Sequence, residues 1–311
     1  MASPLYIHKI YNRLKSLQNP FSARYPIINA PSNLSCTPFF IIGSGRSGNT
    51  LLRSILSGNS DISIPPESYR IPFAIKKFHI FNNRNWEDIV SQVLKEFEDC
   101  KEFYTWEINI KDVQKRLENI EDSKRTLSNI FDELFCTYAE KHSVGSKMWG
   151  DKTPMNTLYL DWIGTVFPHS KFIHIIRDGR DVASSYLKME RYGTILEAAN
   201  RWINSIELAQ SFGSKIKEDY MEIRYEDLVT NTESEIQRVC DFLNIKYDSA
   251  MLDHTKQVGK LGDTDKLHHS NLSKPISSES IGKWKSNLSE SDQESITKLL
   301  HKHLERLGYA D

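Results

Sequence analysis

The sequence predicts an α/β protein, in which a doubly wound parallel sheet is flanked by helices and forms a single domain with a helical insertion. Two observations lead to this fold class. Short apolar runs, which suit fully buried strands, alternate with longer segments whose apolar residues recur at helical spacing. The first of these runs, Phe39–Ile42, also passes through a glycine-rich turn directly into helical periodicity. Strands that alternate with helices form parallel sheets, and ligands bind at the carboxyl ends of such strands.

The composition fits one folded domain without a broad electrostatic surface. Of the 311 residues, 39% are hydrophobic and 26% are charged, which is an ordinary globular balance. The 40 basic residues nearly cancel the 41 acidic ones, so we expect no nucleic-acid partner, and any anion site must be local. No segment reaches the roughly 18 apolar residues of a transmembrane span, and the N-terminus lacks the apolar run of a signal peptide.

The spacing of the cysteines indicates in which cellular compartment the protein works. The four cysteines lie far apart and form neither a CxxC motif nor a metal-binding spacing, so we expect free thiols in a reducing compartment. Together with the missing signal peptide, this predicts a cytoplasmic protein. These cysteines are Cys36, Cys100, Cys136 and Cys240.

The first half of the chain contains the N-terminal segment, two strands and the insertion. Residues 1–37 are predicted to form a short basic amphipathic helix and a linker rich in Pro, Asn and Ser, and the α/β domain then spans 38–311. A short strand is expected at Asp61–Ile64, where two prolines end it because proline cannot donate to a strand ladder. Apolar residues at helical intervals predict a helical insertion over 86–140 that covers one edge of the sheet.

The second half of the chain repeats the alternation of strands and helices. The predicted elements are, in order, a strand and turn within 144–154, a helix over 155–167, a buried strand over 171–176, a helix over 194–212 and a strand over 220–223. Residues 256–280 are polar and rich in glycine and serine, which predicts a long mobile loop. The last helix begins with Ser289 and Asp292 in a capping-box arrangement and runs to about Leu307.

The turn after the first strand has the layout of a phosphate-binding loop, so we expect a sheet of the P-loop type. Backbone N–H groups of such a loop and the N-terminus of the following helix converge on an anion. Gly43, Gly48 and Thr50 match the GxxxxGK[ST] spacing, but Asn49 stands where the motif has lysine. The cation nearby is Arg46. We therefore expect an anion with less charge than a triphosphate, held by an arginine fork in place of Lys and Mg²⁺.

A second candidate anion site follows the strand predicted over 171–176. The sequence there is RDGRDVASSY, in which Arg177 ends the strand and the chain turns at Gly179. Ser185 then lies in the first turns of the next helix. Because both anion-binding segments follow strands of one parallel sheet, we expect them at the same edge of that sheet.

Together the two segments resemble the sulfotransferase superfamily that uses 3′-phosphoadenosine 5′-phosphosulfate (PAPS). The resemblance extends through four further segments in family order, namely Pro65–Glu67, Gly150–Pro154, Tyr225–Leu228 and Gly282–Lys285. It covers residues 38 to about 290 and is closest to the bacterial-type and tyrosylprotein-sulfotransferase-like branches. The ordered set of motifs is far more specific than any one of them.

The resemblance implies a role for each matching residue. The first loop would hold the 5′-phosphosulfate, and Arg177 with Ser185 would hold the 3′-phosphate. Glu67 would be the base, and Lys152 would neutralise charge on the transferring group. The catalytic residues implied are Glu67, Arg46 and Lys152. The residues implied for the nucleotide are Gly45, Arg46, Ser47, Gly48, Asn49, Thr50, Arg177, Ser185, Tyr225 and Lys283.

Two features depart from the related branches. Gly282 stands where the tyrosylprotein branch has a serine directly before Lys-Trp, so a contact to the leaving phosphate is either missing or supplied by Ser280. The cytosolic branch uses a histidine as base, but no histidine here lies in a matching motif. His174 is expected to be a satisfied core residue. The others weighed are His79, His142, His268 and His269.

The implied function is transfer of a sulfuryl group from PAPS to an acceptor hydroxyl, which releases adenosine 3′,5′-bisphosphate and needs no metal. The acceptor can be a glycan, a peptidyl tyrosine or a small alcohol, and the oligomeric state is left open. One alternative is a Mg-ATP-dependent P-loop kinase, which Asn49 and the lack of a Walker-B aspartate disfavour. Another is a catalytically inactive nucleotide-binding protein, which the presence of Glu67 and Lys152 beside both phosphate motifs disfavours.

Overall fold

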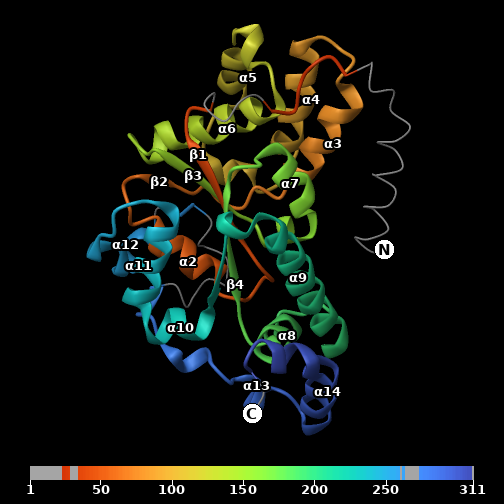
Figure 1. Cartoon of the computed structure of the whole chain (residues 1–311), viewed down its shortest axis with the longest axis vertical. Helices are drawn as coiled ribbons and strands as arrows, with labels where there is room; N and C mark the ends of the chain where they lie inside the picture. Colours follow the sequence, from red (N-terminus) through yellow and green to blue (C-terminus); the bar gives the residue numbers. More distant parts are fainter. Residues whose placement is uncertain (1–22, 29–33, 260, 263–272, 310–311) are drawn as a thin grey trace.

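A five-stranded parallel sheet forms the centre of the protein (Figure 1). The computed structural model describes residues 23–28, 34–259, 261–262 and 273–309. The strand order is β2-β3-β1-β4-β5, with every neighbouring pair parallel. The strands are β1 (Thr37–Ile42), β2 (Ile62–Ser63), β3 (Met148–Lys152), β4 (Lys171–Ile176) and β5 (Tyr220–Arg224). The predicted α/β fold class is confirmed.

Helices cover both faces of this sheet. Figure 1 shows α4, α5 and α6 gathered at one end of the molecule and α8, α13 and α14 at the other. The helices of the first half are α2 (Asn49–Leu56), α3 (Ile71–Phe81), α4 (Trp86–Glu98), α5 (Ile110–Glu118), α6 (Leu127–His142) and α7 (Leu160–Val166). Those of the second half are α8 (Gly179–Lys188), α9 (Ile195–Ile216), α10 (Tyr225–Thr230), α11 (Thr232–Leu243), α12 (Thr255–Val258), α13 (Trp284–Asn287) and α14 (Glu290–Arg306).

The helices that the sequence predicted are present and differ from the predictions at their ends, whereas α3, α10 and α11 were not predicted. The helix predicted over 155–167 begins as a 3₁₀ turn, Pro154–Tyr159, before α7, and α9 continues to Ile216 beyond the predicted end. The capping residue Ser289 was predicted correctly, since its hydroxyl accepts from the Asp292 amide at 3.2 Å. The 256–280 segment is not a continuous loop, because α12 and a 3₁₀ turn occupy its two ends. The N-terminal helix expected within 1–37 and both His268 and His269 lie outside the described residues.

The side chains of β1 alternate between two apolar layers, as the period of a strand requires. Phe40 and Ile42 face a layer built from α3 to α7 and the end of α9. Phe39 and Ile41 face the opposite layer, which contains α2 and α11. Because both faces are covered, the central strands are apolar throughout, which is why the sequence shows them as continuous runs. None of the helices in the described ranges combines the length and the hydropathy that a membrane span requires.

The order of the strands places a reversal of the connections beside β1. The chain leaves β1 into α2, which packs on the Ile41 face, whereas the chain after β4 reaches α9, whose Phe212 packs on the Phe40 face. Neighbouring strands β1 and β4 therefore send their helices to opposite sides of the sheet. This is a topological switch point, and in open α/β sheets ligands bind in the crevice at the carboxyl ends of such strands.

Candidate active site

The loop between β1 and α2 has a backbone that needs glycine. Gly43 has φ 139° and Gly48 has φ 96°, both in the left-handed region. A Cβ at Gly48 would also lie 2.5 Å from Cδ2 of Tyr225, closer than van der Waals contact permits. Arg46 has φ 69°, a strained value for a residue with a side chain, and such strain persists where the surrounding structure holds it.

Hydrogen bonds inside the loop explain why asparagine replaces the P-loop lysine. The Asn49 side-chain amide is buried and donates to the Ser44 carbonyl at 2.7 Å, which closes the loop. From the 3₁₀ turn before α7, the Thr157 hydroxyl accepts from the Gly43 amide at 2.8 Å and lies 2.9 Å from the Gly43 carbonyl. The Asn49 amide, assigned by its motif to the nucleotide, is therefore engaged in the loop itself. Thr157 was not identified from the sequence.

A lysine amine reaches the loop from the neighbouring strand instead. Lys152 ends β3, in register with Ile41 of β1, and its side chain is fully buried. Its Nζ lies 3.2 Å from the Thr50 hydroxyl and forms an ion pair with the Glu67 carboxylate, which is 16% exposed. The structure thus brings together Thr50, Lys152 and Glu67, three residues that the sequence analysis selected from separate motifs.

A second group of predicted residues meets at the ends of β1 and β4. Arg46 Nε donates to the Ser185 hydroxyl at 3.0 Å, and Arg177 Nη1 donates to the Arg46 carbonyl at 3.0 Å. The Arg177 guanidinium lies 4.4 Å from the centroid of the Tyr225 ring, in cation–π geometry. Ser185 therefore pairs with Arg46 in this structure, although the sequence grouped it with Arg177.

The electrostatics of this group suit an anion. Burial lowers the pKa of Arg46, and the like charge of Arg177 lowers it further, while Glu67 opposes the shift. Two arginines so close together repel each other unless a negative charge lies between them. Within the described residues, the Ser47 hydroxyl and Arg177 Nε are buried without a hydrogen-bond partner. These groups provide donors for a phosphate or a phosphosulfate.

The turn that carries Glu67 is held from two sides. The Ser68 hydroxyl donates to Asp151 Oδ2 at 2.5 Å, and the Ser68 amide donates to the Thr153 hydroxyl at 3.0 Å. On the other side, the buried Arg53 guanidinium of α2 donates to the Ile64 carbonyl at 3.1 Å. Because these contacts fix both ends of the turn, they determine where the Glu67 carboxylate lies. Their only signal in the sequence is adjacency, since Ser68 follows Glu67 and Asp151 precedes Lys152.

The segment before α13 is attached to the Arg177 region. Asp181 is buried and accepts from the amides of Gly282 and Trp284 at 2.8 and 2.9 Å. Arg177 Nη2 donates to the Ser280 carbonyl at 2.5 Å, so Ser280 reaches the site through its backbone. Lys283 was predicted to bind the nucleotide, but its side chain is exposed and forms no hydrogen bond or ion pair with the other predicted site residues in the described chain.

His174 differs from the satisfied core residue that we expected. It is fully buried, and its Nδ1 lies 2.6 Å from the Tyr220 hydroxyl, but its Nε2 has no hydrogen-bond partner among the described residues. Its Nδ1 also lies 3.4 Å from Glu222 Oε1 on the edge strand, and its Cδ2 would lie 3.5 Å from a Cβ at Gly43, so the ring borders the loop between β1 and α2.

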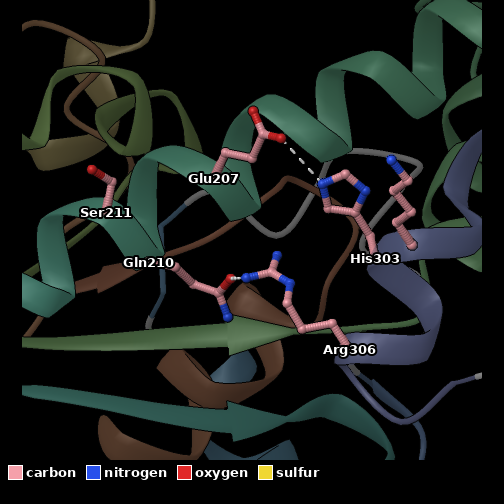
Figure 2. Close-up of a pocket in the computed structure, with 6 residues that line it drawn as sticks. Glu207, Gln210, Ser211, His303 and Arg306 are labelled. Atoms are coloured by element: carbon pink, nitrogen blue, oxygen red, sulfur yellow. Dashed lines mark hydrogen bonds and ion pairs between the residues drawn. The ribbon is translucent and has the colours of Figure 1, made fainter.

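A separate hollow of about 530 Å³ lies between α9 and α14 and contains none of the predicted site residues (Figure 2). Its side chains pair with one another, since His303 Nε2 lies 3.2 Å from Glu207 Oε1 and Arg306 donates to Gln210 Oε1 at 2.5 Å. The lining residues are Glu207, Gln210, Ser211, Lys302, His303 and Arg306. The predicted chemistry is therefore gathered at the strand ends and not in this hollow.

The fold and the site define an α/β protein with a glycine-rich loop after its first strand and buried cationic side chains at the carboxyl ends of its strands. A family model described as "Sulfotransferase family" matches residues 38–249, and the chain belongs to that family. Because the chain belongs to this family, the protein is a sulfotransferase. The family uses PAPS as the sulfuryl donor. In an alignment 323 positions long, the chain is 25% identical to protein-tyrosine sulfotransferase 1 of Danio rerio. The alignment covers 97% of this chain and 82% of that protein.

Two solved structures share the fold. The sulfotransferase domain of the Synechococcus PCC 7002 olefin synthase superposes with a TM-score of 0.60 at 21% identity, covering 88% of this chain and 98% of that one. The sulfotransferase domain of the curacin biosynthetic pathway superposes with a TM-score of 0.55 at 22% identity, covering 86% of this chain and 98% of that one. The predicted fold class and family are thus confirmed.

Replacing Asp151 by Asn should change how stability depends on pH. Burial raises the pKa of Asp151 from 3.8 to about 6. The proton on Asp151 therefore stabilises the folded state below pH 3.8, and this contribution is lost as the pH rises through 6. Relative to Asp151→Asn, the wild type should lose about 1 kcal/mol of unfolding free energy between pH 5 and pH 7.5. Denaturant melts of both proteins at the two pH values measure the difference.

Asp161→Asn is the control for this experiment, because Asp161 is 47% exposed and pairs with Lys215 at the surface. Melts of this variant at the same two pH values show what replacing an exposed aspartate by asparagine does by itself. If the difference in unfolding free energy between Asp151→Asn and the wild type is the same at both pH values, Asp151 is ionised in the folded protein throughout this range, and the prediction is wrong.

Proposed function

We propose that this sulfotransferase moves the sulfuryl group of PAPS to an acceptor hydroxyl by in-line transfer without a metal, and releases adenosine 3′,5′-bisphosphate. The observation that carries the proposal is the contact of Lys152 with both Thr50 and Glu67. It places a cation and a carboxylate together at the N-terminus of α2, where a transferring anionic group is stabilised. A sulfuryl group carries less charge than a phosphoryl group, so protein cations suffice.

The nucleotide would span the crevice at the switch point. Its 5′-phosphosulfate would accept from the amides of the loop between β1 and α2, where the N-terminus of α2 adds positive character. Its 3′-phosphate would lie with Arg177 and Ser185, next to Arg46. Support for this placement comes from the two close arginines and from the buried donors on Ser47 and Arg177 that have no partner in the described chain. Tyr225, beneath Arg177, would border the nucleotide.

Each reacting group then has a partner in the protein. The acceptor oxygen attacks sulfur, its proton passes to the Glu67 carboxylate, and the bond from sulfur to the bridging phosphate oxygen breaks. Lys152 and Arg46 would stabilise the charge that develops on the sulfuryl and leaving phosphate oxygens. Glu67 is ion-paired to Lys152 in this structure. When the sulfuryl group draws the Lys152 ammonium toward itself, Glu67 regains basicity toward the acceptor.

For the acceptor we propose an aromatic alcohol, and a peptidyl tyrosine as the first to test. The matched relative from Danio rerio is named a protein-tyrosine sulfotransferase. In addition, Phe73 lies six positions after Glu67, is 38% exposed and packs against Tyr159 with ring centroids 6.5 Å apart. Phe73 and the partly buried Tyr159 provide aromatic surface against which the ring of an aromatic acceptor would stack.

Adenosine 3′,5′-bisphosphate should raise the melting temperature in excess EDTA, because a ligand that binds only the folded state stabilises it by mass action. ADP, which lacks a 3′-phosphate, should raise it much less. Thermal melts with each nucleotide at equal concentration, with and without Mg²⁺, provide the measurement. Strong stabilisation by Mg-ATP with none by the bisphosphate would instead support the kinase alternative.

Replacing Glu67 by Gln should cut turnover by roughly 10² to 10⁴ while leaving bisphosphate affinity near wild type, since the amide keeps the shape but cannot accept the proton. The melting temperature should fall by a few degrees, because the buried Lys152 ammonium loses its counter-charge. Initial rates with PAPS and a tyrosine peptide, followed by bisphosphate release, measure the effect.

The matched control is Glu235→Gln, which removes another largely buried glutamate that pairs with Arg238 on α11, away from the site. This variant should keep wild-type turnover. If Glu67→Gln also stays within a few-fold of the wild type with a confirmed acceptor, Glu67 is not the base.

A further inference from the structure

Two of the four cysteines lie next to each other in the folded protein. Cys36 stands directly before β1, and Cys136 lies on α6, which runs beside the start of that strand (Figure 1). They are 100 residues apart in the sequence, yet their Sγ atoms are 3.3 Å apart. A disulfide bond is about 2.0 Å long, so the two sulfurs need to approach by only on the order of 1 Å.

The Asp132 carboxylate contacts both the segment that carries Cys36 and the Cys136 side chain. Asp132, one turn before Cys136 on α6, accepts from the Ser35 amide at 2.5 Å, which fixes the residue next to Cys36. Its other oxygen accepts from Trp149 Nε1 at 2.8 Å and lies 3.5 Å from the Cys136 sulfur. The segment that carries Cys36 is therefore tied to α6 independently of the thiols, and the two sulfurs stay close.

The two thiols are not equivalent. Cys36 is half-buried, and its pKa is lowered because the Cys136 thiol donates a hydrogen bond to it. Cys136 is buried, and its pKa is raised by that hydrogen bond and by burial. The thiolate is the reactive form of cysteine, so an oxidant should react first with Cys36. Cys136 would then act as the resolving thiol.

The remaining cysteines provide an internal contrast. Cys100 is buried with its sulfur 3.3 Å from Glu102 Oε2, and Cys240 is buried with its sulfur 4.0 Å from the sulfur of Met251. Neither has a second thiol within bonding range among the described residues. Oxidation should therefore separate the four thiols into one reactive pair and two unreactive residues.

We propose that Cys36 and Cys136 form a reversible intramolecular disulfide when the protein meets a peroxide. The Cys36 thiolate attacks one peroxide oxygen, which forms a sulfenic acid and releases hydroxide. The Cys136 thiol then attacks the Cys36 sulfur, the S–S bond forms, and the sulfenic oxygen leaves as water. In sum, two thiols lose two electrons and two protons, and one hydrogen peroxide becomes two waters. A dithiol reductant reverses the reaction.

The disulfide would join the first strand of the sheet to the last helix of the insertion. It would close a loop of 100 residues that contains β1, β2 and α2 to α5 as well as part of α6. Closing a loop of this size restricts the unfolded chain, so the oxidised protein should be the more stable form. This site is distinct from the sulfuryl-transfer residues, and the inference does not depend on the acceptor.

The test treats the full chain with a small excess of hydrogen peroxide and then blocks the remaining thiols with an alkylating reagent. Peptide mass spectrometry should find one Cys36–Cys136 cross-link, with Cys100 and Cys240 alkylated. The melting temperature should rise by roughly 5 °C and return to its starting value after reduction with dithiothreitol. A cross-link between other cysteines, or none with all four thiols alkylated, would overturn the proposal.

Matched variants separate the pair from general oxidation. Cys136→Ala and Cys36→Ala should each abolish both the cross-link and the shift, and in Cys136→Ala peroxide should leave Cys36 as a sulfenic acid that dimedone traps. Cys240→Ala, an equally buried cysteine, should behave as the wild type. An undiminished peroxide-dependent shift in Cys36→Ala would contradict the assignment even if Cys136→Ala failed to fold.

Discussion

A fully buried ammonium must have its counter-charge within reach, because an unpaired charge in a protein interior costs several kcal/mol. Lys152 imposes this constraint on the end of β3, and the rest of the site is arranged around it. Its amine needs Glu67, so the turn after β2 has to approach β3. The same amine lies 3.2 Å from Thr50, which sets the first turn of α2 against both. The contacts of Ser68 and Arg53 then stabilise an arrangement that the buried charge already requires.

The topology of the sheet adds the second half of the site. Since β1 lies between β3 and β4, the Lys152 group and the Arg177 group stand on opposite sides of one loop. That loop contains Arg46, whose guanidinium reaches Ser185 and whose carbonyl accepts from Arg177. An elongated anion bound at the switch point would contact both groups at once. Under the proposed function, a loop with Asn49 in place of lysine would then serve a donor with a sulfuryl group at one end and a phosphate at the other.

Much of the fold could be predicted from the sequence because its signals are local. The apolar run at Phe39–Ile42 and the cap at Ser289 depend on neighbouring residues, and the site residues in short motifs were recognised from their order. The contacts that position those residues could not be predicted, because they join distant parts of the chain. Ser68 and Asp151 are 83 residues apart, Gly43 and Thr157 are 114 apart, and Cys36 and Cys136 are 100 apart. Only the pairing of β1, β3 and α6 in three dimensions brings them together.

The central claim is that the donor nucleotide lies across the switch point with its 3′-phosphate on Arg177. Calorimetric titration of the wild type and Arg177→Ala with adenosine 3′,5′-bisphosphate and with adenosine 5′-phosphosulfate tests it most directly, since only the first ligand has a 3′-phosphate. The account predicts a loss of roughly 2–5 kcal/mol in affinity for the bisphosphate, from the broken charge-assisted hydrogen bonds, and almost no change for the phosphosulfate. Equal losses for the two ligands would contradict it and would make Arg177 a structural residue that supports Arg46 and Ser280.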